Sequence, residues 1–456
     1  MALAPDISSS TDPVAVEAQG THVDAPELRL FVMGLFFIFG GITSLNDVII
    51  PKLKELFTLN YTQAMLIQFC FFTAYLVIGI PGAKLVKKIG YMRGAVAGLL
   101  TMLAGCLLFV PASQTAMYGL FLLALFVLAS GVVIVQVVAN PLISLLGKPE
   151  TAHSRLTFAQ AFNSLGTTIF PFVGSIVILA PLAAVAGEEL QSFWDVSRIV
   201  DPDCQGGAGH AGHALTGADL ALYRSAESQV VMYTYLGLAA AIAVVAGAVW
   251  LFRNRLKGEV HETGDLAGSL QLLKRPRFGF GALSIFLYVG AEVAIGSLIV
   301  SYLMSSHTLC LTEQSAGKQL IFYWGGAMIG RFVGSAILRY ISPGKVLAFA
   351  ALGSITLIFI SMNTSGASSA NSLLAIGLMN SIMFPTIFSL ASEKLGSRAA
   401  DGSGIINVAI FGGAVIPLIT GALADVTGSV ATALLLPALC YAVIAAFGYY
   451  ARRPAV

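Results

Sequence analysis

Long hydrophobic segments alternate with polar loops from residue 29 almost to the end of the chain, and the loops are short except at residues 183–228 and 253–277. An α-helix needs about 20 apolar residues to cross a bilayer, and most of the segments have about that length. The pattern therefore predicts an all-α membrane protein with twelve transmembrane helices. The predicted spans are residues 29–50, 62–82, 94–111, 116–146, 156–182, 229–252, 278–304, 317–338, 345–363, 370–391, 403–423 and 430–451.

The basic residues divide unequally between the two sides of this arrangement. The two termini and the even-numbered loops hold 20 of the 25 Lys and Arg residues, and the odd-numbered loops hold the other five. Because basic loops stay in the cytoplasm, we expect both termini to be cytoplasmic. The split also supports the count of twelve, since a missed span would exchange the sides of all later loops.

Composition agrees with a membrane protein and divides the chain into regions. Hydrophobic residues make up 57% of the 456 residues and charged residues only 11%, against about 25% charged in a soluble domain. The net charge of +2 gives no reason to expect a nucleic-acid partner. Residues 1–28 read as a disordered cytosolic tail and not as a cleaved signal. A basic, polar linker at residues 253–277 separates an N-terminal half, residues 29–252, from a C-terminal half, residues 278–456.

Polar residues of the first half recur in the second half at a nearly fixed spacing. The matching pairs are Asp47 with Glu292, 245 residues apart, and Gln136 with Asn380, Pro141 with Pro385 and Asn163 with Asn407, each 244 residues apart. Parallel repeats of six spans, related by an axis along the membrane normal, are the architecture of the major facilitator transporters. We therefore predict that fold, with a solute site near the midplane between the halves.

Two acids lie inside the apolar segments, Asp47 in the first and Glu292 in the seventh. A carboxylate at the bilayer centre costs roughly 3 kcal/mol, so such groups usually face a cavity and serve transport. We predict that both couple transport to a cation, a proton or sodium. Asp47 lies nearer the end of its span, so we expect it to be the wetter of the two. The structural alternative is an ion pair with a basic residue, but we expect no Arg or Lys deep in any span.

Amide side chains inside the spans are the candidate substrate-binding groups. An amide both donates and accepts hydrogen bonds, which suits a polyhydroxylated solute, whereas an inorganic anion would need a buried cation. Gln160 and Asn163 are three residues apart and therefore share one helical face. A purely structural role between helices stays open, above all for Gln68 and Asn140. The predicted substrate-binding residues are Asn46, Gln68, Gln136, Gln160, Asn163, Asn380 and Asn407.

Other chemistry is sparse. The aromatic residues Tyr75, Tyr288, Tyr323 and Trp324 can stack on a sugar face, although packing is their more frequent role. The five cysteines show no metal-ligand spacing, and no phosphate-binding loop of the G-x-x-x-x-G-K-[ST] type is present. We expect no cofactor and no metal. Cys204 and Cys310 both fall on the predicted outer side, where a disulfide between them stays open.

Several segments resemble the fucose–galactose–glucose symporter family of the major facilitators. They include LNDVIIPKLKELF, VVANPLISLLG, LTFAQAFNSLG, YVGAEVAIGS and MFPTIFSLA. The resemblance implies a sugar:cation symporter of the bacterial inner membrane, and we expect a monomer. It also implies that Asp47 is essential for coupling and that Gln160 and Asn163 contact the sugar.

The chain departs from the fucose permease pattern at two positions. That pattern has a Glu where this chain has Gln136, and a Gln where this chain has Glu292, which is more similar to the glucose/galactose branch. We therefore predict import of a hexose, glucose or galactose, with a cation. The alternatives are an L-fucose:proton symporter and a sugar sensor that does not translocate. We expect no enzyme, because no reactive Ser, Cys or His cluster stands at the membrane edge.

Overall fold

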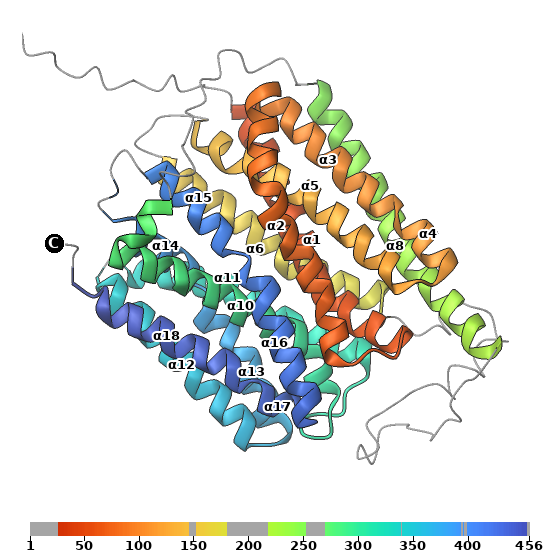
Figure 1. The fold of residues 1–456 in the computed structure, drawn as a ribbon. Coiled ribbons are helices and arrows are strands. Elements are labelled where there is room, and N and C mark those ends of the chain that lie inside the picture. Colours follow the sequence, from red (N-terminus) through yellow and green to blue (C-terminus); the bar gives the residue numbers. More distant parts are fainter. Residues whose placement is uncertain are drawn as a thin grey trace, which may run out of the picture.

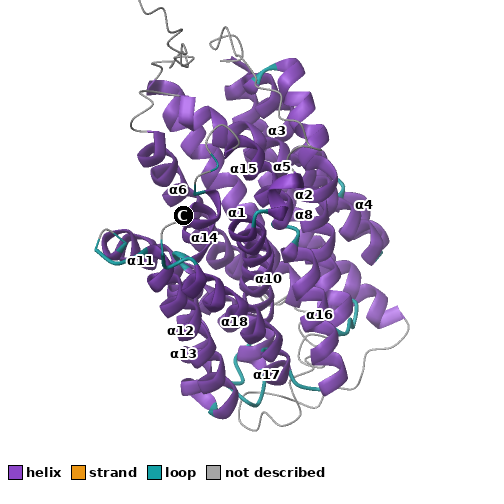
Figure 2. Cartoon of the chain, turned by 60° about the vertical axis from the view of Figure 1, so that its left-hand side comes forward, coloured by secondary structure: helices purple, strands orange, loops and turns teal. Residues whose placement is uncertain are grey.

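The computed structural model describes residues 26–145, 152–179, 218–251, 270–338, 340–393, 395 and 399–453. These residues form helices joined by short turns, and none of them lies in a strand (Figure 2). The helices are α1 (Pro26–Leu56), α2 (Tyr61–Ile89), α3 (Tyr91–Leu107), α4 (Phe109–Thr115), α5 (Tyr118–Leu145), α6 (Ala152–Val177), α8 (Ala218–Leu251), η3 (Gln271–Lys274), α10 (Pro276–Met304), α11 (Glu313–Ile337), α12 (Pro343–Asn363), α13 (Gly366–Asn380), α14 (Met383–Ser392), α15 (Ala399–Ala409), α16 (Gly412–Thr427), α17 (Val430–Ala433) and α18 (Leu435–Tyr450).

These helices make twelve long segments. In the part of the chain that the structure describes, ten segments are long and apolar enough to cross a membrane, and the more polar α6 and α11 complete the twelve. Four segments consist of two consecutive helices each: α3 with α4, α13 with α14, α15 with α16 and α17 with α18. The predicted all-α fold with twelve spans is therefore confirmed.

The helices gather in two groups (Figure 1). Helices α1 to α5 and α8 lie toward the upper right and α10 to α18 toward the lower left, with α6 between them in this view. The groups touch where α1 packs against α10, α2 against α16 and α6 against α11. We call the groups α1–α8 and α10–α18 the first and second halves. The boundaries predicted for the tail and the linker stay predictions, because most of both segments lies outside the described residues.

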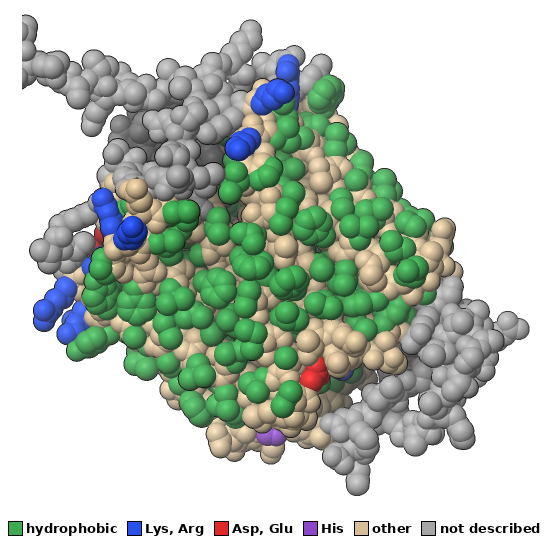
Figure 3. All heavy atoms as spheres, in the orientation of Figure 1, with side chains coloured by type: hydrophobic (Ala, Val, Ile, Leu, Met, Phe, Trp, Pro, Cys, Tyr) green, Lys and Arg blue, Asp and Glu red, His purple; other side chains and the backbone are tan. Residues whose placement is uncertain are grey.

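Consecutive segments alternate in direction, so the bundle has two ends. We call them the Tyr61 end, where α1 is followed by α2, and the Arg277 end, where α10 begins. Figure 3 shows hydrophobic side chains over the broad middle of one face and Lys and Arg side chains along its upper left, toward the Arg277 end. This distribution matches that of a helix bundle whose apolar flanks contact lipid.

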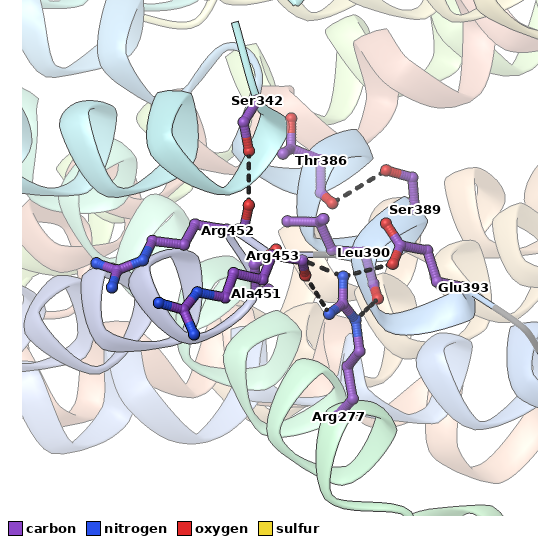
Figure 4. Close-up of polar contacts among 9 residues, drawn as sticks. All are labelled: Arg277, Ser342, Thr386, Ser389, Leu390, Glu393, Ala451, Arg452 and Arg453. Atoms are coloured by element: carbon purple, nitrogen blue, oxygen red, sulfur yellow. Dashed lines mark hydrogen bonds and ion pairs between the residues drawn. The ribbon is translucent and has the colours of Figure 1, made fainter. Parts of the chain in front are cut away.

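Arg277 ties the second half together at its own end (Figure 4). Its guanidinium donates to the backbone oxygens of Leu390 at 3.0 Å and Arg453 at 2.9 Å, and it pairs with Glu393 at 2.5 Å. These partners belong to α14, to its C-cap Glu393 and to the turn after α18. The bonds therefore link three segments of one half and do not cross to the other half.

Glycine allows close helix packing at two points inside the second half. A Cβ on Gly377 of α13 would overlap the backbone oxygen of Tyr323 in α11, and one on Gly412 would overlap the backbone oxygen of Phe286 in α10. Small residues that let backbones approach are the usual means of packing helices in membranes. The arrangement of α10, α11, α13 and α16 therefore depends on these two positions.

Substitution of Gly377 tests this packing. Gly377→Ala should lower the free energy of unfolding by about 1–3 kcal/mol, because the added methyl group forces α11 and α13 apart. Gly237→Ala in α8 is the matched control, since an added Cβ there meets nothing within 4 Å. Thermal unfolding in detergent measures both. Equal melting temperatures for the two variants would contradict the packing argument.

Candidate functional site

Asp47 is buried between the two halves, with only 2% of its surface exposed. Its Oδ1 accepts hydrogen bonds from Gln68 Nε2 at 3.3 Å and from Ser297 Oγ at 3.2 Å. Its Oδ2 accepts one from Trp324 Nε1 at 3.1 Å. Gln68 belongs to the first half, whereas Ser297 in α10 and Trp324 in α11 belong to the second. The carboxylate therefore joins the halves through its own hydrogen bonds.

Two predicted substrate-binding amides lie beside this acid. Gln68 Nε2 also donates to Ser297 Oγ at 2.8 Å, and Asn46 Nδ2 donates to Gln68 Oε1 at 3.2 Å. Both amides are 1% exposed. The Oδ1 atom of Asn46 is buried and has no hydrogen-bond partner. The structure thus places Gln68 against the carboxylate and Asn46 against Gln68, so that Gln68 helps to orient the acid.

Glu292 lies in α10, on the side of the second half. Tyr288, one turn earlier, donates from its hydroxyl to Glu292 Oε1 at 2.8 Å. Glu292 keeps part of its surface accessible, whereas Asp47 is buried. The expectation that Asp47 would be the wetter acid was wrong, because α10 and α11 of the other half cover it. Distance from the end of a span says nothing about which neighbouring helix lies over it.

Asn380 is the centre of a hydrogen-bond network in the second half. Its Nδ2 donates to the Tyr323 hydroxyl at 3.0 Å, and its Oδ1 accepts from the Tyr441 hydroxyl at 2.8 Å. Its backbone oxygen accepts from Tyr288 at 3.0 Å, and Tyr323 also donates to the backbone oxygen of Glu292 at 3.1 Å. The residue is 0% exposed. The residue therefore joins α10, α11, α13 and α18 through its side chain and its backbone oxygen.

The other predicted amides are accessible. Gln136, Gln160 and Asn163 are partly exposed, and Asn407 is exposed. Gln136 Nε2 donates to the Tyr75 hydroxyl at 2.9 Å, and Asn163 Nδ2 lies 3.5 Å from the backbone oxygen of Phe36. Gln160 and Asn163 are on α6, which packs against α11 of the second half. The seven predicted residues thus form a buried set around the two acids and an accessible set of four.

A cation lies between the halves, contrary to the expectation from the sequence. Arg331 in α11 donates from Nη1 to Ser164 Oγ of α6 and from Nε to the backbone oxygen of Ser381, 3.3 Å away. Its charge also acts on Glu292. In addition, Lys52 is only 4% exposed inside α1. Arg331 lies near the end of an apolar segment but turns inward, so a basic residue reaches the interface between the halves, where none was expected.

Several partners of the acids carry no signal in the sequence. Ser297, Tyr441 and Arg331 have no local pattern that marks them as interior partners of Asp47, Asn380 and Ser164. Trp324 was singled out for stacking, but its indole donates a hydrogen bond. The side chain of Asn140 lies outside the described residues. Cys310 is disulfide-bonded, and Cys204 lies outside the described residues.

Twelve helices in two halves with acids and amides between them define a secondary transporter of the major facilitator type. Residues 32–185 match the model of the Major Facilitator Superfamily. A glucose/galactose transporter of Brucella abortus biovar 1 (strain 9-941) is 47% identical over 416 residues, which cover 91% of each chain. An L-fucose-proton symporter of Escherichia coli (strain K12) is 31% identical over 446 residues, or 95% of this chain and 96% of that one.

A crystal structure of the transporter FucP in the outward conformation aligns with a TM-score of 0.67 at 31% identity. It covers 94% of this chain and 99% of the other. The chain belongs to the Major Facilitator Superfamily, in the family of the fucose, galactose and glucose symporters. The resemblance seen in the sequence is therefore confirmed.

The network around Asn380 generates a prediction about stability. Asn380→Ala removes the acceptor of the buried Tyr441 hydroxyl and the donor to the Tyr323 hydroxyl, so the free energy of unfolding should fall by about 1–3 kcal/mol. Asn163→Ala is the matched control: Asn163 is partly exposed and makes one long bond, so its melting temperature should change little. Thermal unfolding in detergent measures the melting temperature of both variants. If the melting temperature of Asn163→Ala falls as far as that of Asn380→Ala, the network does not contribute more to stability than a single partly exposed amide.

Proposed function

We propose that this chain imports a hexose, glucose or galactose, together with a proton or a sodium ion by alternating access. The observation that carries the proposal is the position of Asp47, an acid buried between the halves and bonded to both. The relatives support the sugar assignment, because the Brucella abortus protein is named a glucose/galactose transporter. We propose that the protein acts as a monomer in a bacterial inner membrane, with the basic Arg277 end in the cytoplasm.

We place the sugar among the accessible amides between the halves. Gln136, Gln160, Asn163 and Asn407 present donors and acceptors that match sugar hydroxyls. Ser164, next to Asn163, is the residue that Arg331 contacts from the second half. A sugar bound at Gln160 and Asn163 would therefore lie beside a contact that holds the two halves together. This placement supports a link between sugar binding and the relative position of the halves.

We assign cation coupling to Asp47 and Glu292. A buried carboxylate accepts stronger hydrogen bonds when it is charged than when it is neutral. A cation bound to Asp47 therefore changes the strength of its bonds to Ser297 and Trp324 in the opposite half. Glu292, partly accessible and held by Tyr288, is the second acid that a cation can reach. Loading these acids would alter the balance between the two orientations of the halves.

Uptake by the purified protein in proteoliposomes tests the proposal. With a proton or sodium gradient imposed separately, the parent should accumulate labelled glucose or galactose under one of them. Asp47→Asn and Glu292→Gln should lose at least about tenfold of this accumulation, because a neutral amide takes up neither cation electrostatically. Exchange of internal for external sugar, which needs no net cation movement, should persist in both. Accumulation at the parental level in both variants would contradict the coupling assignment.

Binding experiments separate the sugar site from the coupling acids. Asn163→Ala should weaken sugar binding about tenfold through loss of a hydrogen bond, whereas Asn371→Ala, at an exposed amide of α13, should bind like the parent. Equal binding by both variants would place the sugar elsewhere. Accumulation of L-fucose, and not of glucose or galactose, would favour the symporter named in the Escherichia coli relative. Binding without any uptake would indicate a sensor.

A further inference from the structure

Helices α2 and α16 come from opposite halves and pack against each other toward the Tyr61 end. Gly413, Pro417, Gly421 and Asp425 follow one another at intervals of four residues, so they lie along one face of α16. A Cβ on Gly413 would lie 2.9 Å from the ring of Phe72 in α2, and a Cβ on Gly421 would lie 2.8 Å from the backbone oxygen of Tyr61. This face of α16 therefore meets α2 closely, and Asp425 stands at the end of the contact.

Asp425 binds the first turn of α2 across the boundary between the halves. Its Oδ1 accepts from the backbone N–H of Tyr61 at 2.7 Å. Its Oδ2 accepts from the backbone N–H of Thr62 at 2.7 Å and from the Thr62 hydroxyl at 2.5 Å. An acid at a helix N-terminus also interacts favourably with the helix dipole. Both carboxylate oxygens of Asp425 therefore accept hydrogen bonds from the first half.

The N–H groups that Asp425 binds are those that the local cap of α2 leaves open. The first N–H groups of a helix have no partner within the helix. Asn60 Oδ1 accepts from the N–H of Gln63 at 2.7 Å, and Gln63 Oε1 accepts from the N–H of Asn60 at 3.0 Å. That capping box serves the third position of the helix. The first two positions, Tyr61 and Thr62, take their acceptor from the opposite half.

Positive charge adds to the contact. Lys54, near the end of α1, places its Nζ 4.3 Å from the centre of the Tyr61 ring, and its charge interacts with that of Asp425. Lys54 and Tyr61 belong to the first half and Asp425 to the second. The attraction between the two charges therefore acts in the same direction as the three hydrogen bonds.

We propose that Asp425 is a releasable latch that holds the outer entrance between the halves shut. The proposal rests on the proposed function, which makes the Tyr61 end the outer side and requires it to open. Opening separates α2 from α16 and breaks all three bonds to Asp425. Water then replaces the lost partners at this half-buried position, so release is reversible. The latch sets how often the outer side opens, and it acts apart from the acids that carry the cation.

Distances between two spin labels on opposite halves test the latch. Thr115 and Asn363 are exposed sites near the Tyr61 end, one in each half, and become the labelled cysteines in a Cys70→Ser background. The parent should show mainly the short, closed distance. Asp425→Asn removes the charge, so the ratio of open to closed molecules should rise at least about fivefold. Thr62→Val, which removes only the hydroxyl donor, should shift the ratio in the same direction by a smaller factor.

The matched control is Thr427→Ala, two residues from Asp425 on the same helix. The Thr427 hydroxyl bonds to Leu423 and Ser429 within its own half, so its loss should leave the ratio unchanged. An unchanged ratio in both Asp425→Asn and Thr62→Val would overturn the latch, as would an equal shift in the control. The measurement needs no sugar and no cation gradient. A shifted ratio without sugar uptake would therefore refute the proposed function and leave the latch standing.

Discussion

The carboxylate of Asp47 lies in an apolar helix bundle, and three donors surround it. A buried charge without partners would cost several kcal/mol, so these donors must be in place when the acid is ionised. Because Ser297 and Trp324 come from the second half and Gln68 from the first, the requirement can be met only when the halves are close together at this point. The electrostatics of one side chain thus constrain the relative position of two six-helix units.

Polar side chains of the bundle have two roles: some join helices within one half, and others join the two halves. Asn380 and the tyrosines that it binds hold four helices of the second half in a fixed arrangement, and Arg277 does the same at one end of that half. Among the described residues, contacts between the halves include those of Arg331 with Ser164, of Asp425 with the start of α2, and of Asp47 with its donors in the second half. Rigid halves with exchangeable contacts between them are what alternating access requires.

Much of the fold could be predicted from the sequence, because bilayer thickness imposes a simple length rule on every span. The twelve segments follow from this rule, and the two acids and the repeated amides were identified because they are polar residues inside those segments. The break after Asn380, at Ser381 and Ile382, was not predicted, although Pro385 is a signal for it, since a proline ring clashes with the carbonyl four residues earlier. The inward turn of Arg331 was not predicted, because the hydropathy pattern indicates the position of a residue along a helix but not which neighbouring helix its side chain faces.

The residues of the candidate site could be predicted only in part, because hydropathy does not indicate which neighbour a side chain faces. Asn46, Gln68 and Asn380 are polar residues in apolar spans, which singled them out, but the structure gives their amides to Asp47, Gln68 and two tyrosines. Of the seven predicted substrate-binding residues, four keep accessible surface: Gln136, Gln160, Asn163 and Asn407. Whether an interior amide faces a cavity or a neighbour depends on packing between distant segments. No local pattern records it.

A double-mutant cycle between Asp47 and Trp324 tests most directly whether the acid links the halves. The quantity measured is the free-energy difference between the closed and the open arrangement of the halves. It is compared among four proteins: the parent, Asp47→Asn, Trp324→Phe and the double variant. We expect a coupling of at least about 1 kcal/mol, because Trp324→Phe removes the indole donor and Asp47→Asn removes the charge that strengthens the same bond. Effects that add within about 0.3 kcal/mol would contradict it, since they would show that the bond between the two side chains does not hold the halves together.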